Sequence, residues 1–198
     1  MSRRIILVAS MLAMLGSLRP VSAEIIDRIV AVVDNTFIIT LSDIQKERTI
    51  QKAIGNNPGD DDSLVDTLIE KHLIEGQIAL FREIDIDDAD VNERLRGVQI
   101  PGGITLDELR VAVQSELRRY EFTVQRFRPL IQASDDELRQ YFQTVIVPAL
   151  QQRGAPIPPV EQGMLDARPL VLAEKMNKEA DDWLNDLKRR TTIEKTLK

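Results

Sequence analysis

The sequence predicts a mainly α-helical protein with a small β-sheet, and three observations lead to this fold class. Two β-branched runs, 25–33 and 37–39, flank Asp34-Asn35-Thr36, a tripeptide typical of hairpin turns. Apolar residues recur at helical spacing through most of the remaining chain. The last residues, Ile193 to Leu197, form another β-prone segment. An isolated hairpin is only marginally stable in water, so we expect this C-terminal strand to complete one small mixed sheet.

The first 23 residues have the pattern of a signal peptide. Arg3 and Arg4 precede an apolar run at 5–18 that is short for a membrane span, and Val21-Ser22-Ala23 resembles a cleavage site. We therefore expect export to the periplasm with cleavage after Ala23. The sequence leaves open whether the Sec or the twin-arginine route is used.

The charge of residues 24–198 narrows the class of partner. They carry 23 Lys or Arg and 32 Asp or Glu, because all three charges of the leader are Arg. An acidic surface repels nucleic acid and anionic lipid, so neither is expected as a partner. The chain has no Cys, and no later apolar run approaches membrane length. We expect no disulfide and no integral membrane segment after cleavage.

About six helices follow from periodicity and from their start signals. The pairs Thr40 with Asp43, Thr105 with Glu108, and Ser134 with Glu137 have the spacing of capping boxes. The helices are expected at about 41–54, 60–81, 89–97, 105–131, 134–148 and 170–187, with ends or interruptions at Pro129 and Pro148. The fourth has the clearest apolar stripe, which predicts these core residues: Leu109, Val113, Leu117, Tyr120, Val124, Phe127 and Ile131.

Composition changes between Gln151 and Pro169, where four Pro and two Gly occur. This predicts an extended linker. We divide the chain into a leader (1–23), the N-terminal part of a core (24–150), the Pro-rich linker (151–169), and a helix and strand that complete the core (170–198).

The order of these parts resembles a known family. The stretches I-V-A-V-V-D-N-T-F-I-I-T-L-S-D-I, L-V-D-T-L-I-E-K-H-L-I-E-G-Q-I-A-L and A-E-K-M-N-K-E-A-D-D-W-L-N-D-L-K-R-R-T-T-I-E-K resemble the core of SurA-type periplasmic chaperones. The resemblance covers about 26–131 and 170–197. It implies an apolar cradle that binds unfolded exported polypeptides, typically outer-membrane proteins.

The chain also departs from this family. Full-length members carry parvulin-type prolyl isomerase domains between the two parts of the core, whereas only residues 131–169 are available here. Parvulin sites typically contain paired His, and this chain has one, His72. We therefore expect no isomerase activity, and the Pro-rich linker takes the position of the missing domains.

No residue pattern indicates catalysis, a cofactor or a metal. His72 has no nucleophile or second His beside it in the sequence, so we interpret it as a helix-flank residue. The acidic groups at 60–62 and 85–90 lack the Gly and the final Glu of a calcium loop and suit helix N-termini instead. The Arg residues between 118 and 139 are interpreted as a solvated helix face.

Five apolar residues are candidates for contact with unfolded chains. Phe122 lies off the apolar stripe of its helix, and the alternative is that it packs inside the protein. Met164 and Leu165 lie in the Pro-rich segment, as contacts or as a groove cover. The set consists of Phe122, Tyr141, Phe142, Met164 and Leu165.

These expectations lead to one functional hypothesis and two alternatives. The hypothesis is an ATP-independent periplasmic chaperone, or holdase, that binds unfolded outer-membrane proteins. The first alternative is an adaptor that binds one folded envelope partner through the Pro-rich segment or the hairpin edge. The second is a divergent prolyl isomerase. The sequence leaves open a homodimer formed by exchange of a strand or helix.

Overall fold

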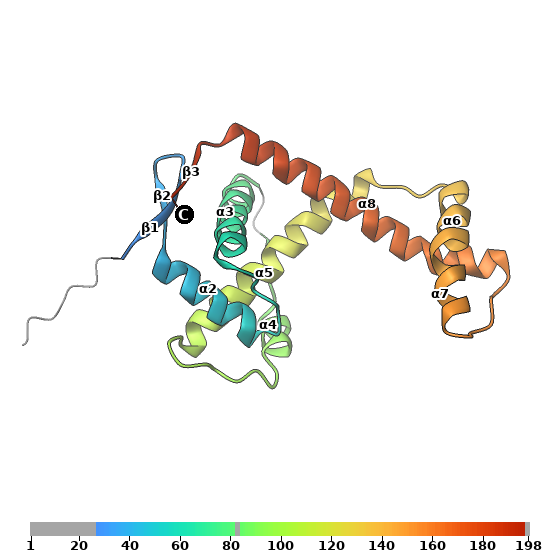
Figure 1. Ribbon diagram of the computed structural model, residues 1–198, viewed down its shortest axis with the longest axis horizontal. Coiled ribbons are helices and arrows are strands. Elements are labelled where there is room, and N and C mark those ends of the chain that lie inside the picture. Colours follow the sequence, from blue (N-terminus) through green and yellow to red (C-terminus); the bar gives the residue numbers. More distant parts are fainter. Residues whose placement is uncertain (1–26, 82–83, 197–198) are drawn as a thin grey trace, which may run out of the picture.

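The computed structural model describes residues 27–81 and 84–196, so the predicted signal peptide lies outside the described residues. The protein is mainly α-helical with a small sheet, as predicted. Figure 1 shows a body that contains the sheet, and an arm that projects from it along one long helix. We define the arm as residues 128–180 and the body as the other described residues. Within the described residues, no helix is both long and apolar enough to span a bilayer.

The sheet consists of β1 (Ile29–Val33), β2 (Phe37–Thr40) and β3 (Ile193–Lys195), in the order β2-β1-β3. Asp34 and Asn35 have φ values of 47° and 56°, the left-handed region that their side chains tolerate. β3 pairs with β1, so the C-terminal strand completes the hairpin as predicted, and Thr196 N donates to Val30 O at 2.8 Å. The expectation of a mixed sheet is wrong, because both pairings are antiparallel.

The body contains α2 (Leu41–Ala53), α3 (Asp61–Ile78), α4 (Asp88–Arg94) and α5 (Leu106–Phe127). Thr40 and Thr105 cap α2 and α5 in the predicted capping boxes, while Asp60 and Asp87 cap α3 and α4. These acids satisfy amides that would otherwise lack partners. The predicted starts of these helices are therefore confirmed to within about two residues.

Two apolar clusters hold the body together. The first packs the inner face of the sheet on α2 and α3, and it contains Val30, Ala31, Val33, Ile39, Ile44, Leu64, Val65 and Ile69. The second packs α2 and α4 on the first half of α5, and it contains Ile50, Ile54, Val91, Ile104, Leu109 and Val113. Lys188 and Lys195 also pair with Glu70 and Asp66 of α3, at 2.6 Å each, and so fix the C-terminal end of the chain to the body.

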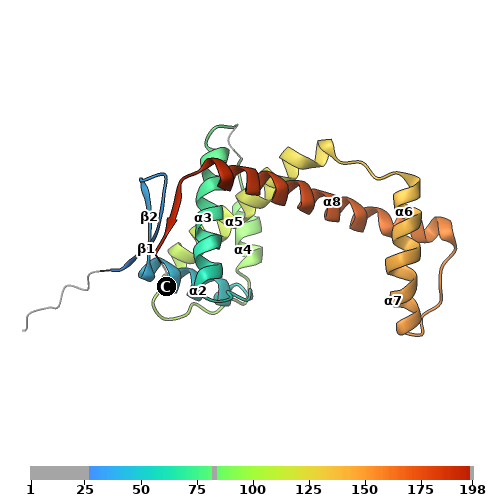
Figure 2. The ribbon, with the colours of Figure 1, turned by 45° about the horizontal axis from the view of Figure 1, so that its top comes forward.

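The arm is built from helices that pack on the N-terminal half of α8 (Val160–Arg190). After a 3₁₀ turn at Arg128–Leu130, α6 (Asp135–Tyr141) continues through a π-helical turn (Phe142–Ile146) into α7 (Val147–Gln152). Leu138, Ala167 and Val171 form the small core of the arm. Figures 1 and 2 show α6 and α7 beside the end of α8 that is most distant from the sheet.

Two expectations about this region are wrong. The helix begun at Ser134 is not broken at Pro148, since α6, the π-helical turn and α7 follow one another without a break and Pro148 lies just after the π-helical turn, where a helix can accommodate the lost hydrogen bond. The segment predicted as an extended linker becomes helical at Val160 and remains so through Pro169. Gly163 and Ala167 are buried against α6 and the π-helical turn, so burial of this face stabilises a helix that composition alone disfavours.

Candidate functional site

α8 has one apolar face, and the body covers only half of it. Leu165, Pro169, Leu172, Met176, Ala180, Trp183 and Leu187 follow one another at steps of three or four residues and therefore share this face. Trp183 packs against α5. Leu165 is 61% exposed, and Pro169 is also exposed. The apolar face thus continues beyond the elements that cover it.

The covered half is centred on an aromatic joint between α5 and α8. The Trp183 ring lies 5.9 Å from the Phe122 ring and 5.6 Å from the Phe127 ring, measured between centroids. The Arg126 guanidinium carbon is 5.0 Å from the Trp183 centroid and also lies over Phe81. Stacked cations and edge-to-face rings are directional contacts, so they fix the angle at which α8 leaves the body.

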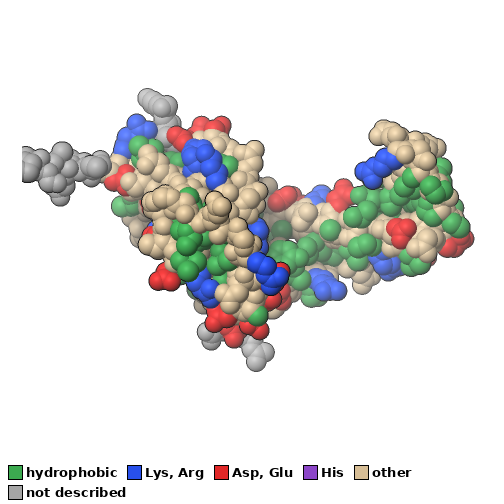
Figure 3. Space-filling view, turned by 90° about the horizontal axis from the view of Figure 1, so that it is seen from below, with side chains coloured by type: hydrophobic (Ala, Val, Ile, Leu, Met, Phe, Trp, Pro, Cys, Tyr) green, Lys and Arg blue, Asp and Glu red, His purple; other side chains and the backbone are tan. Residues whose placement is uncertain are grey.

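The uncovered half of α8 borders a hollow of about 400 Å³ between α8 and the end of α5, which we call the neck hollow. It is lined by Tyr120, Val124, Arg128, Ile131, Pro169, Leu172, Ala173 and Met176. Tyr120 is 63% exposed. Arg128 supplies the only charge among these lining residues. Figure 3 shows hydrophobic side chains gathered along the segment that joins the body to the arm.

Pro169 gives this surface a polar feature. A proline has no backbone N–H, so within α8 the carbonyl of Leu165 lacks its usual donor four residues later. Leu165 lies one turn further out on the same face as the hollow. The surface therefore combines apolar side chains with a helical turn that lacks one backbone hydrogen bond.

A polar clamp holds α6 on α8 beside this surface. Lys175 Nζ lies 2.5 Å from Glu137 Oε1 and donates to the Gln132 carbonyl at 2.8 Å. Glu137 also caps α6, accepting from the Ser134 amide at 2.8 Å. The hydrogen bond from Lys175, followed by the bonds from Ser134, lowers the pKa of Glu137 from 4.5 to about 2. The carboxylate is therefore charged at neutral pH.

The tip of the arm depends on one close contact. A Cβ at Gly163 would lie 2.2 Å from Cε2 of Phe142, a separation that real Cβ atoms do not adopt. Phe142 begins the π-helical turn and is 2% exposed. Its ring occupies the space above Gly163, so glycine is required for α8 to approach the turn.

The five predicted contact residues do not form one surface. Phe122 and Phe142 are 3% and 2% exposed, so the interpretation of these two as surface contacts is wrong. Phe122 packs on Trp183, and Phe142 packs on Gly163. Tyr141 and Met164 are half-buried at the small core of the arm. Leu165 alone lies on the open face of α8.

Only some features of the residues that line the neck hollow can be predicted from the sequence. The stripe of α5 predicts Tyr120 in the core, but Tyr120 lies between the cluster that buries Val113 and the aromatic joint that buries Phe127, and it is exposed. Its hydroxyl, which tolerates solvent, was the available signal. Leu172 and Met176 lie opposite this end of α5, an arrangement that depends on tertiary structure.

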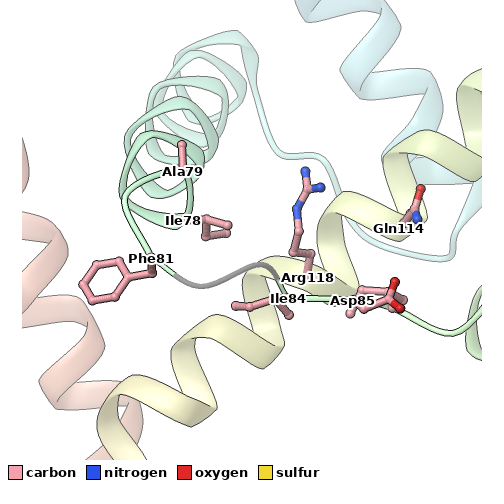
Figure 4. Close-up of a pocket in the computed structure, with 8 residues that line it drawn as sticks. Ile78, Ala79, Phe81, Ile84, Asp85, Gln114 and Arg118 are labelled. Carbon is pink, nitrogen blue, oxygen red and sulfur yellow. The ribbon is translucent and has the colours of Figure 1, made fainter.

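A second hollow, of about 340 Å³, lies between the end of α3 and the middle of α5 (Figure 4). Ile78, Phe81 and Ile84 provide apolar walls, and Arg118 rises from α5 toward α3. Arg118 Nη2 donates to Glu75 Oε2 at 2.9 Å, and Arg119 Nη1 donates to the other oxygen of the same carboxylate at 2.9 Å. Residues 82–83, which separate Phe81 from Ile84 in the sequence, lie outside the described part of the chain, and we assign this hollow no function.

The His and Asp side chains that could in principle take part in catalysis or metal binding have structural roles in this protein. The His72 ring stacks on Phe37 of the hairpin with centroids 3.9 Å apart, on the flank of α3 as predicted. Asp60 and Asp87 cap helices, as interpreted from the sequence. Among residues 27–81 and 84–196, no three His, Cys, Asp or Glu side chains gather as a metal site would require.

No family model matches the chain, and no match was found among curated proteins. The resemblance to SurA-type chaperones therefore stays a prediction. The fold and the open face of α8 are the observations on which a function can be argued.

Proposed function

We propose that this protein is an ATP-independent periplasmic holdase that binds unfolded exported polypeptides, including outer-membrane proteins, at the neck hollow and the open face of α8. The observation that carries the proposal is the apolar face of α8, which extends past the body and remains exposed at Leu165. Exposed apolar surface that is continuous with a hollow favours binding of another chain.

The shape and chemistry of the hollow suit an unfolded segment. Tyr120, Leu172 and Met176 offer an aromatic ring, an aliphatic chain and a flexible thioether, which adapt to many apolar side chains. Arg128 at the rim favours segments that carry an acidic residue.

The proposed mechanism is mass action. Reversible binding divides the free concentration of aggregation-prone chains by one plus the ratio of the free chaperone concentration to the dissociation constant. The excess of acidic over basic residues keeps the chaperone itself soluble while its apolar surface is empty. No nucleotide is required in this scheme, since release follows when the client, the bound unfolded chain, folds or inserts elsewhere.

The direct test is suppression of aggregation. A urea-unfolded outer-membrane protein is diluted into buffer with residues 24–198 at one to five equivalents, and light scattering is followed. We expect scattering to fall with increasing chaperone. Unchanged scattering at five equivalents, for several such clients, would contradict the proposal. Capture of one folded partner at fixed stoichiometry would favour the adaptor instead.

A matched pair of variants locates the site. Tyr120 and Val111 are both on α5 and are 63% and 62% exposed, but only Tyr120 lines the neck hollow. We expect Tyr120→Ser to raise the client dissociation constant by about tenfold, equivalent to about 1.4 kcal/mol. Val111→Ser should leave it unchanged. Equal effects of the two variants, measured by fluorescence anisotropy of a labelled client, would move the site away from the hollow.

A further inference from the structure

We propose that two copies of this protein pair antiparallel through the open faces of their α8 helices, so that each arm covers the neck hollow of the other copy. This pairing would occupy the same surface that we propose for clients, and its regulatory part rests on that proposed function. The pairing itself is argued from the spacing, shape and charge of the arm.

The spacing of the open face matches a helix-pairing seam. Leu165, Pro169, Leu172 and Met176 are separated by four, three and four residues, the alternation found where helices pack along their length. The same face packs against the protein's own α5 further along, at Trp183. A helix from a second copy would give the outer half the kind of partner that the inner half already has.

Charge favours contact between arms over contact between bodies. The arm carries six basic and seven acidic residues, whereas the described residues of the body carry 15 basic and 23 acidic. Two bodies therefore repel each other, while two arms are nearly neutral. The arm is the part of the molecule at which two copies can approach at least electrostatic cost.

The shape selects the antiparallel arrangement. The arm projects away from the body along α8 (Figures 1 and 2). If two arms ran parallel, the acidic bodies would lie side by side. If they run antiparallel, each body lies beside the tip of the other arm, and the bodies are as far apart as the contact allows. A two-fold axis near residues 169–172 gives this closed dimer.

The contact is small and therefore weak. The hollow and Leu165 supply about nine side chains per copy, fewer than the roughly 20–30 residues per side of a standard stable interface. We expect a dissociation constant of the dimer in the micromolar range. An unfolded client present in excess can therefore displace the second copy. Idle chaperone would then hide its apolar surface, and client binding would release monomers.

Sedimentation velocity of residues 24–198, from about 1 to 100 µM, tests the pairing. We expect a monomer that converts to a dimer over this range. Leu165→Glu should remain monomeric throughout, because a buried carboxylate would raise the dissociation constant by about 100-fold or more. Val111→Glu, which adds the same charge at an equally exposed site of the body, should dimerise like the parent.

Crosslinking tests the orientation, because the chain has no Cys of its own. Leu172→Cys lies near the proposed axis and should form a disulfide-linked dimer on mild oxidation, whereas Val111→Cys should not. A parent protein that stays monomeric at 100 µM, a Leu165→Glu dimer, or a stronger crosslink at residue 111 would each overturn the pairing.

Client competition separates this inference from the proposed function. Adding an unfolded outer-membrane protein to the dimer should yield complexes that contain one copy of the chaperone. Intact dimers with bound client would overturn the shared surface. Dimers that form and dissociate as described, without any suppression of aggregation, would contradict the holdase proposal and leave the pairing standing.

Discussion

The packing of the arm leaves no room for a side chain at Gly163. A methyl group there would overlap the Phe142 ring, so Gly163→Ala forces the π-helical turn away from α8. We expect a loss of about 1–3 kcal/mol in the stability of the arm, measured by hydrogen exchange across 135–171. Gly76→Ala is the matched control, since a Cβ added there would meet no atom within 4 Å outside its own helical turn and Ala favours α3. Equal exchange in the Gly163 variant and the parent would contradict this contact.

Glu137 gives the arm a pH dependence whose direction is fixed. Its pKa of about 2 in the folded protein lies below the ordinary 4.5, so the clamp to Lys175 contributes fully above pH 4.5. That contribution is lost as pH falls from 4.5 through 2. We expect faster amide exchange in α6 over this window, and a Glu137→Gln variant that exchanges faster already at pH 7. An α6 that is equally protected at pH 5 and pH 2 would be inconsistent with the clamp.

Features that depend on neighbouring residues can be predicted from the sequence, whereas burial that depends on distant residues cannot. The capping boxes at Thr40, Thr105 and Ser134 were predictable because both partners lie within four residues. Tyr120 is predicted in the core and is exposed, whereas Phe122 packs inside the protein, the alternative to its role as a surface contact, because burial on α5 depends on which neighbours reach each turn. α8 covers Phe122 through Trp183, and the contact spans 61 positions in sequence. The spacing of apolar residues along α5 cannot reveal a contact with a residue so distant in the sequence.

β3 is the element whose removal tests the closure of the body. Asp34 N donates to Thr192 O at 2.8 Å, and Ile193 packs on the cluster between the sheet, α2 and α3. A chain ending at Arg190 leaves β1 with an unpaired edge. We expect its melting temperature to fall by at least about 5 °C, followed by circular dichroism. A truncated protein that melts like the intact one would contradict the three-stranded sheet.

α8 shows where an element cannot be predicted from composition. The prolines at 156, 158, 159 and 169 are typical of an extended linker. In the structure, Pro159 only precedes the helix, and Pro169 lies on its exposed face, where its ring meets solvent or the neck hollow. Packing of Ala167 and Val171 on Leu138 offsets the lost hydrogen bond. The signal for this helix lay in its partner α6, more than 20 residues away.

The sequence predicts that the two ends of the chain meet in one sheet, but it does not predict the arm. The sheet was predictable because a hairpin needs a third strand and the C-terminus was the available one. The projection of α8 beyond the body was not, because it depends on the length of α8 relative to the helices that cover it. The candidate site is a consequence of that difference in length, so only Leu165 of the five predicted contacts lies on it.

The aromatic joint couples the arm to the body, and it is the place to test whether they unfold together. Trp183 contacts both Phe122 and Phe127, and it is the only Trp in the chain. We expect Trp183→Ala to cost about 3 kcal/mol and to split urea unfolding, followed by circular dichroism, into separate arm and body transitions. Trp183→Phe keeps an aromatic ring at the joint and should retain one transition at a slightly lower midpoint. If Trp183→Ala unfolded in a single transition at the parent midpoint, the Lys188–Glu70 ion pair between α8 and α3 and the β3 pairing would be sufficient to couple arm and body. The open face of α8 would then be held in place by the C-terminal end of the chain and not by its aromatic contacts.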